Sequence, residues 1–236
     1  MGTTLNMLCI FDVDGTLTPS RGRIDETFRL WLLNNFKLPY VLITGSDPAK
    51  TREQIGDELY DSTVVYNCSG NHIFDRGKEV YRSNWSISPK LRKYLESRLN
   101  SSSWPEKTGR HIEERVGLCN FSVLGRNATI DQRQAYYQYD KTAGERKHIA
   151  TEIMNTWPDI EVGVAGETGI DICAKSTGKS QLINYERGRH PYHFFGDRMD
   201  PAGNDYPLAK AIWDNNLGQC HHVGNWQETW NILRTI

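Results

Sequence analysis

The 236-residue sequence predicts an α/β protein with a parallel sheet and a second domain inserted into it. An apolar segment, 7–11, ends in the sequence DVDGT (residues 12–16), which is typical of a buried parallel strand with polar residues at its carboxyl end. Strands and helices alternate before and after residues 84–185, whereas within that stretch short strands are joined by tight turns. We therefore expect a Rossmann-like α/β core of residues 1–83 and 186–236. The insertion, 84–185, is expected to be an α+β cap with an antiparallel sheet.

The sequence of the first part of the core predicts one βαβ unit, followed by a further helix, a strand and a hairpin. Phe28, Trp31, Leu32 and Phe36 recur at helical spacing after Asp25, which is a suitable N-cap. The hairpin is centred on the turn sequence Arg76-Gly77. The expected elements are strand 7–11, helix 28–36, strand 40–44, helix 47–59, strand 64–66, and the hairpin strands 71–74 and 79–81.

The insertion and the segment in which the chain returns to the core have different orders of helices and strands. In the insertion we expect helix 89–99, strands 110–115 and 118–123, helices 131–139 and 145–156, and strands 160–164 and 170–173. In the return we expect a helix after Gly178, strand 192–196, helix 206–213, strand 220–223 and a last helix from Trp226. The second pattern resumes the strand–helix alternation of a doubly wound sheet.

Composition excludes several classes of protein. The net charge is −1 and the pI is near 6.7, so the sequence indicates neither nucleic-acid binding nor binding to an anionic membrane. No apolar run approaches the roughly 18 residues that span a bilayer, and the N-terminus lacks the features of a signal peptide. We therefore expect a cytoplasmic protein. Its cysteines are scattered and are expected to be buried, reduced thiols: Cys9, Cys68, Cys119, Cys173 and Cys220.

The two carboxylates of DVDGT indicate chemistry at the end of the first strand. Alternate residues of a strand point apart, so Asp12 and Asp14 share a site only if the chain turns after Asp12, and Gly15 permits that turn. Two neighbouring acids suit a magnesium-dependent phosphoryl transfer in which one attacks phosphorus and the other moves a proton. The structural alternative is a solvated Asp-Gly turn.

DVDGT after an apolar strand resembles the first motif of the haloacid dehalogenase superfamily, and three further motifs follow in the order that this superfamily has. The second is a strand that ends in Thr44, followed by Gly45 and Ser46. The third is Lys179. The fourth is strand 193–196, which leads into Asp197 and then into Gly203, Asn204 and Asp205.

The insertion contains a more specific pattern. Arg115, Arg126 and Arg133 lie at the ends of an expected hairpin and at the start of a helix, where converging guanidinium groups would bind a dianion; the alternative is three solvated surface arginines. The surrounding string resembles the cap of the eukaryotic-type α-phosphomannomutases. The matching residues are Glu113, Arg115, Gly117, Asn120, Ser122, Gly125, Arg126 and Arg133.

Three motifs depart from the pattern of that family. Gly169 stands where a serine is expected, although Asp171 keeps the acid of the same motif. Thr44 replaces a glycine and is closer to the phosphatase form, and Thr177-Gly178-Lys179 replaces Trp-Asp-Lys.

The resemblance implies interconversion of mannose 6-phosphate and mannose 1-phosphate, and of the glucose pair too, primed by a hexose 1,6-bisphosphate. It implies that Asp12 is the nucleophile and Asp14 the acid and base, and that Thr44, Ser46 and Lys179 hold the transferring phosphoryl group. The implied Mg²⁺ ligands are Asp12, the backbone carbonyl of Asp14, and Asp197, tuned by Asn204 and Asp205. The implied substrate-binding residues are Arg115, Asn120, Arg126, Arg133, Gly169 and Asp171. The family further implies a homodimer formed through the caps.

Two alternatives remain at this point. A sugar-phosphate phosphatase of the same superfamily would use the same core and transfer the phosphoryl group to water. A non-catalytic phosphosugar-binding protein is the alternative from another class, but such a protein does not need Asp12, Asp14, Lys179 and Asp197 together.

Overall fold

The computed structural model describes residues 7–189, 191–201 and 203–236, and it divides into two compact units. The first unit contains a seven-stranded sheet in the order β11-β10-β1-β2-β3-β4-β5. Five of these strands, from β11 to β3, are parallel, whereas β4 and β5 are antiparallel additions at one edge. The parallel strands are β1 (Leu8–Phe11), β2 (Tyr40–Ile43), β3 (Val64–Asn67), β10 (Tyr192–Gly196) and β11 (Gly218–His222).

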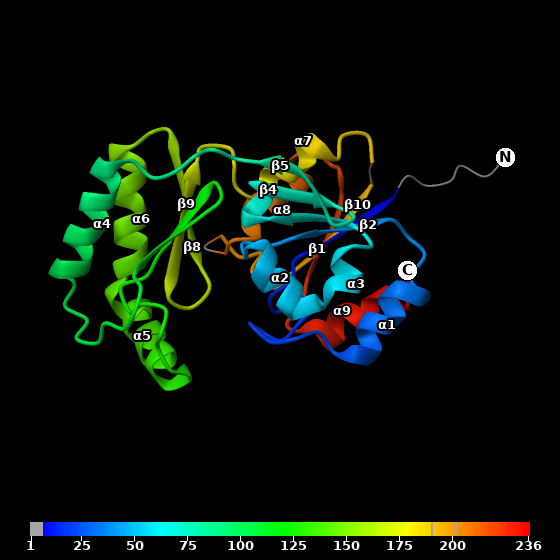
Figure 1. The fold of residues 1–236 in the computed structure, drawn as a ribbon, viewed down its shortest axis with the longest axis horizontal. Coiled ribbons are helices and arrows are strands. Elements are labelled where there is room, and N and C mark those ends of the chain that lie inside the picture. The colour runs from blue at the N-terminus through cyan, green and yellow to red at the C-terminus, as the bar shows by residue number, and fades with distance from the viewer. Residues whose placement is uncertain (1–6, 190, 202) are drawn as a thin grey trace. The chain divides into compact units, whose positions relative to one another are not determined.

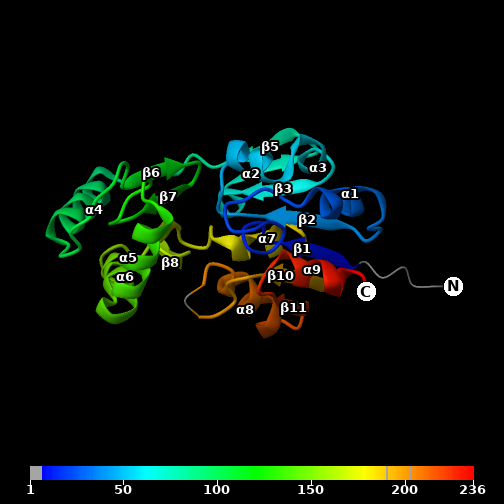
Figure 2. The same cartoon turned by 90° about the horizontal axis from the view of Figure 1, so that it is seen from below.

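Helices cover both faces of this sheet (Figures 1 and 2), because every residue of its central strand β1 is apolar and successive side chains point to opposite faces. Cys9 and Phe11 of β1 pack in one core with α1, α2, α3 and α9, whereas Leu8 and Ile10 pack in a second core with α7 and α8. The helices are α1 (Glu26–Asn34), α2 (Pro48–Ile55), α3 (Asp57–Tyr60), α7 (Leu182–Tyr185), α8 (Tyr206–Asp214) and α9 (Trp226–Leu233). The remaining elements are β4 (His72–Asp75), β5 (Lys78–Arg82) and the 3₁₀ turns η1 (Cys68–Gly70) and η2 (Lys179–Gln181).

The second unit is a four-stranded antiparallel sheet with helices on one face. Its strand order is β6-β7-β9-β8. Apolar residues that alternate along these strands, such as Phe121 and Ile172, pack against α4, α5 and α6. The elements are α4 (Pro89–Ser101), β6 (Ile112–Arg115), β7 (Leu118–Phe121), α5 (Ile130–Ala143), α6 (Glu145–Thr156), β8 (Ile160–Ala165) and β9 (Gly169–Ala174).

The structure corrects the sequence prediction for the segment 47–59. We expected one helix, but α2 ends at Ile55 and α3 begins at Asp57. Gly56 lies between them with φ of 80°, a left-handed conformation that a continuing helix cannot contain. The apolar spacing continues across the break, which is why the sequence pattern alone did not reveal it.

The chain returns to the first unit at Lys179, whereas the sequence placed the return at 186. Among the described residues, the first unit consists of 7–82, 179–189, 191–201 and 205–236, and the second of 83–178 and 203–204. Residues 179–185 belong with the sheet because Leu182 of α7 is fully buried in the same core as Leu8 and Ile10. The expectation that no signal peptide is present falls partly on residues 1–6, which lie outside the described residues.

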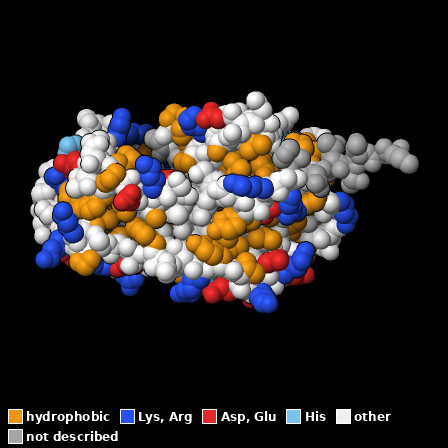
Figure 3. All heavy atoms as spheres, turned by 90° about the horizontal axis from the view of Figure 1, so that it is seen from above, with side chains coloured by type: hydrophobic (Ala, Val, Ile, Leu, Met, Phe, Trp, Pro, Cys, Tyr) orange, Lys and Arg blue, Asp and Glu red, His pale blue; other side chains and the backbone are white. Residues whose placement is uncertain are grey.

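The surface has no single charged field on the face drawn in Figure 3, where Lys and Arg side chains are scattered among other types. This agrees with the net charge of −1. Within the described part of the chain, no helix is long and apolar enough to cross a membrane. All five cysteines are free thiols.

Candidate active site

The carboxyl ends of the parallel strands bring together residues from three of the four motifs. The backbone N–H of Asp12, directly after β1, donates to the carbonyl of Phe195 in β10, at 3.0 Å. The neighbouring turn requires Gly15: its φ is 81°, and a Cβ built there would lie 2.5 Å from Oδ2 of Asp197. The absence of a side chain at residue 15 therefore lets Asp197, the acid of the fourth motif, approach the loop after β1.

Lys179 joins the first motif to the fourth. Its Nζ lies 2.5 Å from Oδ1 of Asp12 and 2.7 Å from Oδ1 of Asp205. All three side chains are buried, and only 1% of the Lys179 side chain is exposed. Burial lowers the pKa of Lys179, but the two carboxylates outweigh this effect and raise the pKa above its ordinary value. Lys179 is therefore an ammonium ion at neutral pH.

Burial raises the pKa of Asp12 well above its ordinary value, and the Lys179 ammonium opposes that shift. The charges of Asp205 and Asp197 add to the effect of burial. Thr16 adds a long hydrogen bond from its Oγ1 to Oδ2 of Asp12, at 3.4 Å. The ionised form of Asp12, which a nucleophile requires, thus depends chiefly on Lys179.

The donor set of this site fits a divalent cation that prefers oxygen. Oxygen atoms of Asp12, Asp197 and Asp205 lie within 4.8 Å of one another. Burial, followed by the charge of Asp205, raises the pKa of Asp197 to about 6. Crowded carboxylates of this kind are relieved by a cation, and carboxylate oxygens suit Mg²⁺. The expected Asn204 falls in the second unit, so its place relative to these acids is not described.

Asp14 is held by groups that the motifs do not include. Its Oδ1 accepts hydrogen bonds from the backbone N–H of Arg21, at 2.6 Å, and from Nε2 of Gln54, at 2.8 Å. Gln54, on α2, is only 1% exposed. The sequence analysis did not identify Gln54. The signal that was available is its position on the helix that follows the second motif.

The loop of the second motif is hydrogen-bonded to a turn that contains two residues with positive φ. Cys68 and Ser69 both have positive φ, of 50° and 60°, and their N–H groups donate to the carbonyls of Ser46 and Thr44. The hydroxyl of Thr44 accepts from the N–H of Ser46 at 3.1 Å. Thr44 is buried, whereas Ser46 is partly exposed. The loop that was expected to hold phosphoryl oxygens is therefore fixed by backbone bonds from strained residues.

In the second unit, the sheet face opposite the apolar core carries the residues that were expected to bind substrate. The strand register places Glu113, Asn120, Asp171 and Gly163 side by side in one row. Nδ2 of Asn120 donates to Oδ1 of Asp171 at 2.7 Å. A Cβ built at Gly163 would have nothing within 4 Å, so the row ends in open space beside Asp171.

Glu113, which the sequence analysis used only as part of a motif, links two of the three arginines. Its Oε1 lies 2.7 Å from Nη2 of Arg115, and its Oε2 lies 2.7 Å from Nε of Arg126. Burial alone raises the pKa of Glu113, but the two guanidinium groups outweigh it and lower the pKa below the ordinary value. Arg133 is paired elsewhere: its Nε lies 3.6 Å from Oε2 of Glu167.

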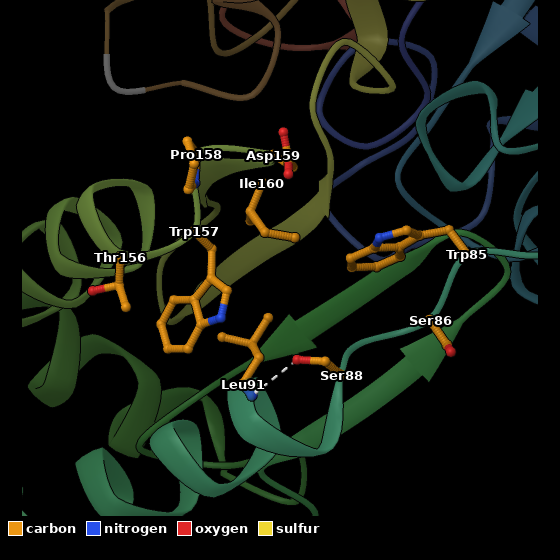
Figure 4. Close-up of a pocket in the computed structure, with 9 residues that line it drawn as sticks. All are labelled: Trp85, Ser86, Ser88, Leu91, Thr156, Trp157, Pro158, Asp159 and Ile160. Carbon is orange, nitrogen blue, oxygen red and sulfur yellow. Dashed lines mark hydrogen bonds between the residues drawn. The ribbon is translucent and has the colours of Figure 1, made fainter.

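Gly169 lies against Asn120. A Cβ at Gly169 would be 2.8 Å from Nδ2 of Asn120, so the serine that the family pattern has there would require the Asn120 amide to shift. A separate pocket of about 210 Å³ lies in the second unit, between the start of α4 and the end of α6 (Figure 4). Trp85, Trp157 and Ile160 line it, and none of the residues expected in the site does.

The fold and the first site define a haloacid-dehalogenase-type phosphotransferase: a doubly wound sheet with an inserted cap, an Asp-x-Asp loop after the first strand, and a buried lysine between carboxylates. Solved structures agree with the fold. A Plasmodium falciparum IMP-nucleotidase mutant superposes with a TM-score of 0.65 at 15% identity, covering 97% of this chain and 67% of that chain. A haloacid dehalogenase-like hydrolase from Bacteroides thetaiotaomicron gives a TM-score of 0.60 at 14% identity, with 97% and 98% covered.

Sequence comparison identifies the family. The profile of the eukaryotic phosphomannomutase family matches residues 32–236, and the chain belongs to this family. The Saccharomyces cerevisiae phosphomannomutase is 31% identical over 97% of this chain and 93% of that protein. The phosphomannomutase of Galdieria sulphuraria is 28% identical over 92% and 94%. The resemblance read from the motifs is thereby confirmed.

Proposed function

We propose that this chain interconverts mannose 6-phosphate and mannose 1-phosphate. The observation that carries the proposal is the family match over residues 32–236, because it includes the whole cap as well as the second, third and fourth superfamily motifs. The curated relatives named above are phosphomannomutases, and they align with nearly the whole chain. The bridge from Lys179 to Asp12 supports the phosphoryl-transfer part of the proposal.

In the proposed reaction, the free hydroxyl of a hexose monophosphate attacks the phosphorus of the Asp12 aspartyl phosphate, and the bond from phosphorus to the Asp12 oxygen breaks. Asp14 takes the proton of that hydroxyl, and the product is a hexose 1,6-bisphosphate. In the second half-reaction, after this intermediate has turned round, a carboxylate oxygen of Asp12 attacks the phosphorus of the other phosphate, the bond from that phosphorus to the sugar oxygen breaks, and Asp14 gives its proton to the departing oxygen. The isomeric monophosphate leaves, and Asp12 is again an aspartyl phosphate. Gln54 and the N–H of Arg21 hold one oxygen of Asp14, which leaves the other for the proton.

The groups around Asp12 are proposed to stabilise the transferring phosphoryl group. Lys179, Ser46 and Thr44 supply a cation and two hydroxyl or amide donors at the carboxyl ends of the strands. Asp12, Asp197 and the backbone of Asp14 would hold Mg²⁺, which when bound offsets the charge that develops on the phosphoryl oxygens.

Residues of the second unit are proposed to recognise the sugar and the phosphate that does not react. Arg115, Arg126 and Arg133 carry the charge that suits a dianion, and Asn120 and Asp171 offer hydrogen bonds to sugar hydroxyls. A hexose 1,6-bisphosphate is the proposed activator, because it can phosphorylate Asp12 at the start of a cycle.

We also propose a cytoplasmic location, supported by the five free thiols, and a homodimer formed through the second unit. Light scattering of the purified protein tests this: a mass near twice 27.1 kDa is expected, and a mass of 27.1 kDa would exclude the dimer.

The activity is tested by ³¹P NMR with mannose 1-phosphate, Mg²⁺ and a trace of glucose 1,6-bisphosphate. We expect mannose 6-phosphate to accumulate with little free phosphate, and we expect the Asp12→Asn variant to be inactive. Accumulation of free phosphate without isomerisation would contradict the proposal and indicate a phosphatase. A similar rate with Asp12→Asn would exclude Asp12 as the nucleophile.

A further inference from the structure

The turn between β8 and β9 adjoins most of the polar groups on the outer face of the second sheet. Glu167, within the turn, is paired with Arg133. Gly169, at its end, lies against the amide of Asn120. Asp171 follows two residues later on the same face and accepts a hydrogen bond from Asn120. The position of this turn therefore sets the position of three groups proposed to bind substrate.

One buried guanidinium holds both ends of the turn. Nη1 of Arg146, in the first turn of α6, donates to the carbonyl of Gly166 at 3.0 Å and to that of Gly169 at 3.3 Å. Nε of Arg146 donates to Oδ2 of Asp140 at 2.7 Å, and the backbone N–H of Arg146 donates to the other oxygen at 2.9 Å. Arg146 is 5% exposed and Asp140 is 8% exposed.

This arrangement is not what stability alone would favour. A buried ion pair commonly contributes no more than apolar side chains of the same volume, because both charges lose their hydration. Arginine differs from lysine in its planar fork of donors, which can reach an acid and two carbonyl groups at once. In Arg146 this fork ties the turn to the corner between α5, which contains Asp140, and α6.

We propose that Arg146, oriented by Asp140, is a positioning residue for hexose-phosphate recognition by the second unit. The substrate class in this inference rests on the proposed function. The contact between Arg146 and the turn does not depend on that function. A shift of the turn changes both the approach of Gly169 to Asn120 and the distance between Glu167 and Arg133. Oδ1 of Asn120 is buried without a hydrogen-bond partner among the described residues, and the same amide is held through its Nδ2 by the hydrogen bond to Asp171.

The test is the variant Arg146→Lys, which keeps the positive charge beside Asp140 but loses the fork that reaches both carbonyls. The matched control is Arg98→Lys in the same unit, because Arg98 joins α4 to α6 through Tyr94 and Glu152 and does not contact the turn. Amide hydrogen exchange of the full-length protein is measured for residues 166–170. Steady-state kinetics are measured with mannose 1-phosphate, and the loading of Asp12 with phosphate is measured with acetyl phosphate.

We expect exchange at 166–170 to accelerate about tenfold in Arg146→Lys and not in Arg98→Lys. We expect KM for mannose 1-phosphate to rise about tenfold, while kcat and acetyl-phosphate loading stay within about twofold. Unchanged exchange would overturn the contact, and accelerated exchange with an unchanged KM would overturn its role in recognition. An equal loss with both phosphoryl donors would also overturn that role, because it indicates general destabilisation.

The experiment distinguishes failure of the proposed function from failure of the inference about Arg146. If the parent protein does not isomerise mannose 1-phosphate, the proposed function fails and recognition of this substrate by way of Arg146 fails with it. The exchange result still decides whether Arg146 holds the turn.

Discussion

Nζ of Lys179 lies 2.5 Å from Oδ1 of Asp12, although the two residues are 167 positions apart in the sequence. The same ammonium lies 2.7 Å from Asp205, so one cation neutralises a carboxylate from the first motif and another from the fourth. All three groups are buried. The charge state of Asp12 and the docking of three chain segments therefore depend on one side chain.

Replacement of this lysine tests that dependence. In Lys179→Met, Asp12 and Asp205 lose their counter-ion, so burial is no longer opposed and the pKa of Asp12 rises further. We expect kcat to fall by about 10²–10³-fold at least. We expect the free energy of unfolding to fall by roughly 3–5 kcal/mol, measured by urea titration. Lys210→Met removes an exposed ion pair with Asp214 and is the control, which should change neither quantity.

Gln54 should matter for the departure of the sugar oxygen but not for the attack on phosphorus. It donates to Oδ1 of Asp14, the proposed acid, at 2.8 Å. In Gln54→Leu we expect turnover of mannose 1-phosphate to fall about tenfold, because the hydrogen bond that orients the side chain of Asp14 is lost. Acetyl phosphate should still load Asp12 at the parental rate, because acetate is a good leaving group that needs no proton.

The control for this experiment is Glu53→Gln, an exposed neighbour of Gln54 on α2. It should leave both rates unchanged. Equal losses with both phosphoryl donors in Gln54→Leu would mean that Gln54 supports the fold of the site and does not orient Asp14.

The sequence predicted the fold and the main motifs because each depends on the spacing of residues that are close together in the chain. The apolar strand 7–11 and the turn at Gly15 are examples. Groups that reach the site from elsewhere leave no such pattern. Gln54 meets Asp14 from a helix 40 positions further along the sequence, and Arg146 meets the turn at 166–169 because α6 packs beside β8 and β9. Contacts of this kind depend on tertiary packing, which spacing does not contain.

Mg²⁺ should stabilise the folded protein if the three converging carboxylates bind it. Burial and the charge of Asp205 raise the pKa of Asp197 to about 6. The raised pKa indicates repulsion between neighbouring carboxylates, which a bound cation would reduce. We expect the melting temperature to rise with millimolar MgCl₂ and to fall back with EDTA. Asp197→Asn should reduce the rise, whereas the exposed variant Asp214→Asn should retain it. An equal rise in both variants would place the bound Mg²⁺ at another site.

The two histidines on β10 and β11 should make stability depend on pH. Nδ1 of His193 lies 3.1 Å from Nε2 of His221, and burial lowers the pKa of both rings below the ordinary value of 6.5. The folded chain therefore binds fewer protons than the unfolded chain when the pH falls below that value. Stability from this pair is complete above 6.5 and decreases as the pH falls toward the lower pKa of the folded state.

The change that tests this pair is His193→Asn, which removes one titrating ring and keeps a polar side chain. Urea unfolding is compared at about pH 7.5 and about pH 5.5, on either side of the ordinary histidine pKa. We expect the parent to lose more of its unfolding free energy between these conditions than the variant does, because only the parent must keep both rings neutral. The carboxylates near Asp12 titrate alike in both proteins, so their contribution cancels in the difference. Equal losses in parent and variant would show that protonation of this pair does not oppose folding.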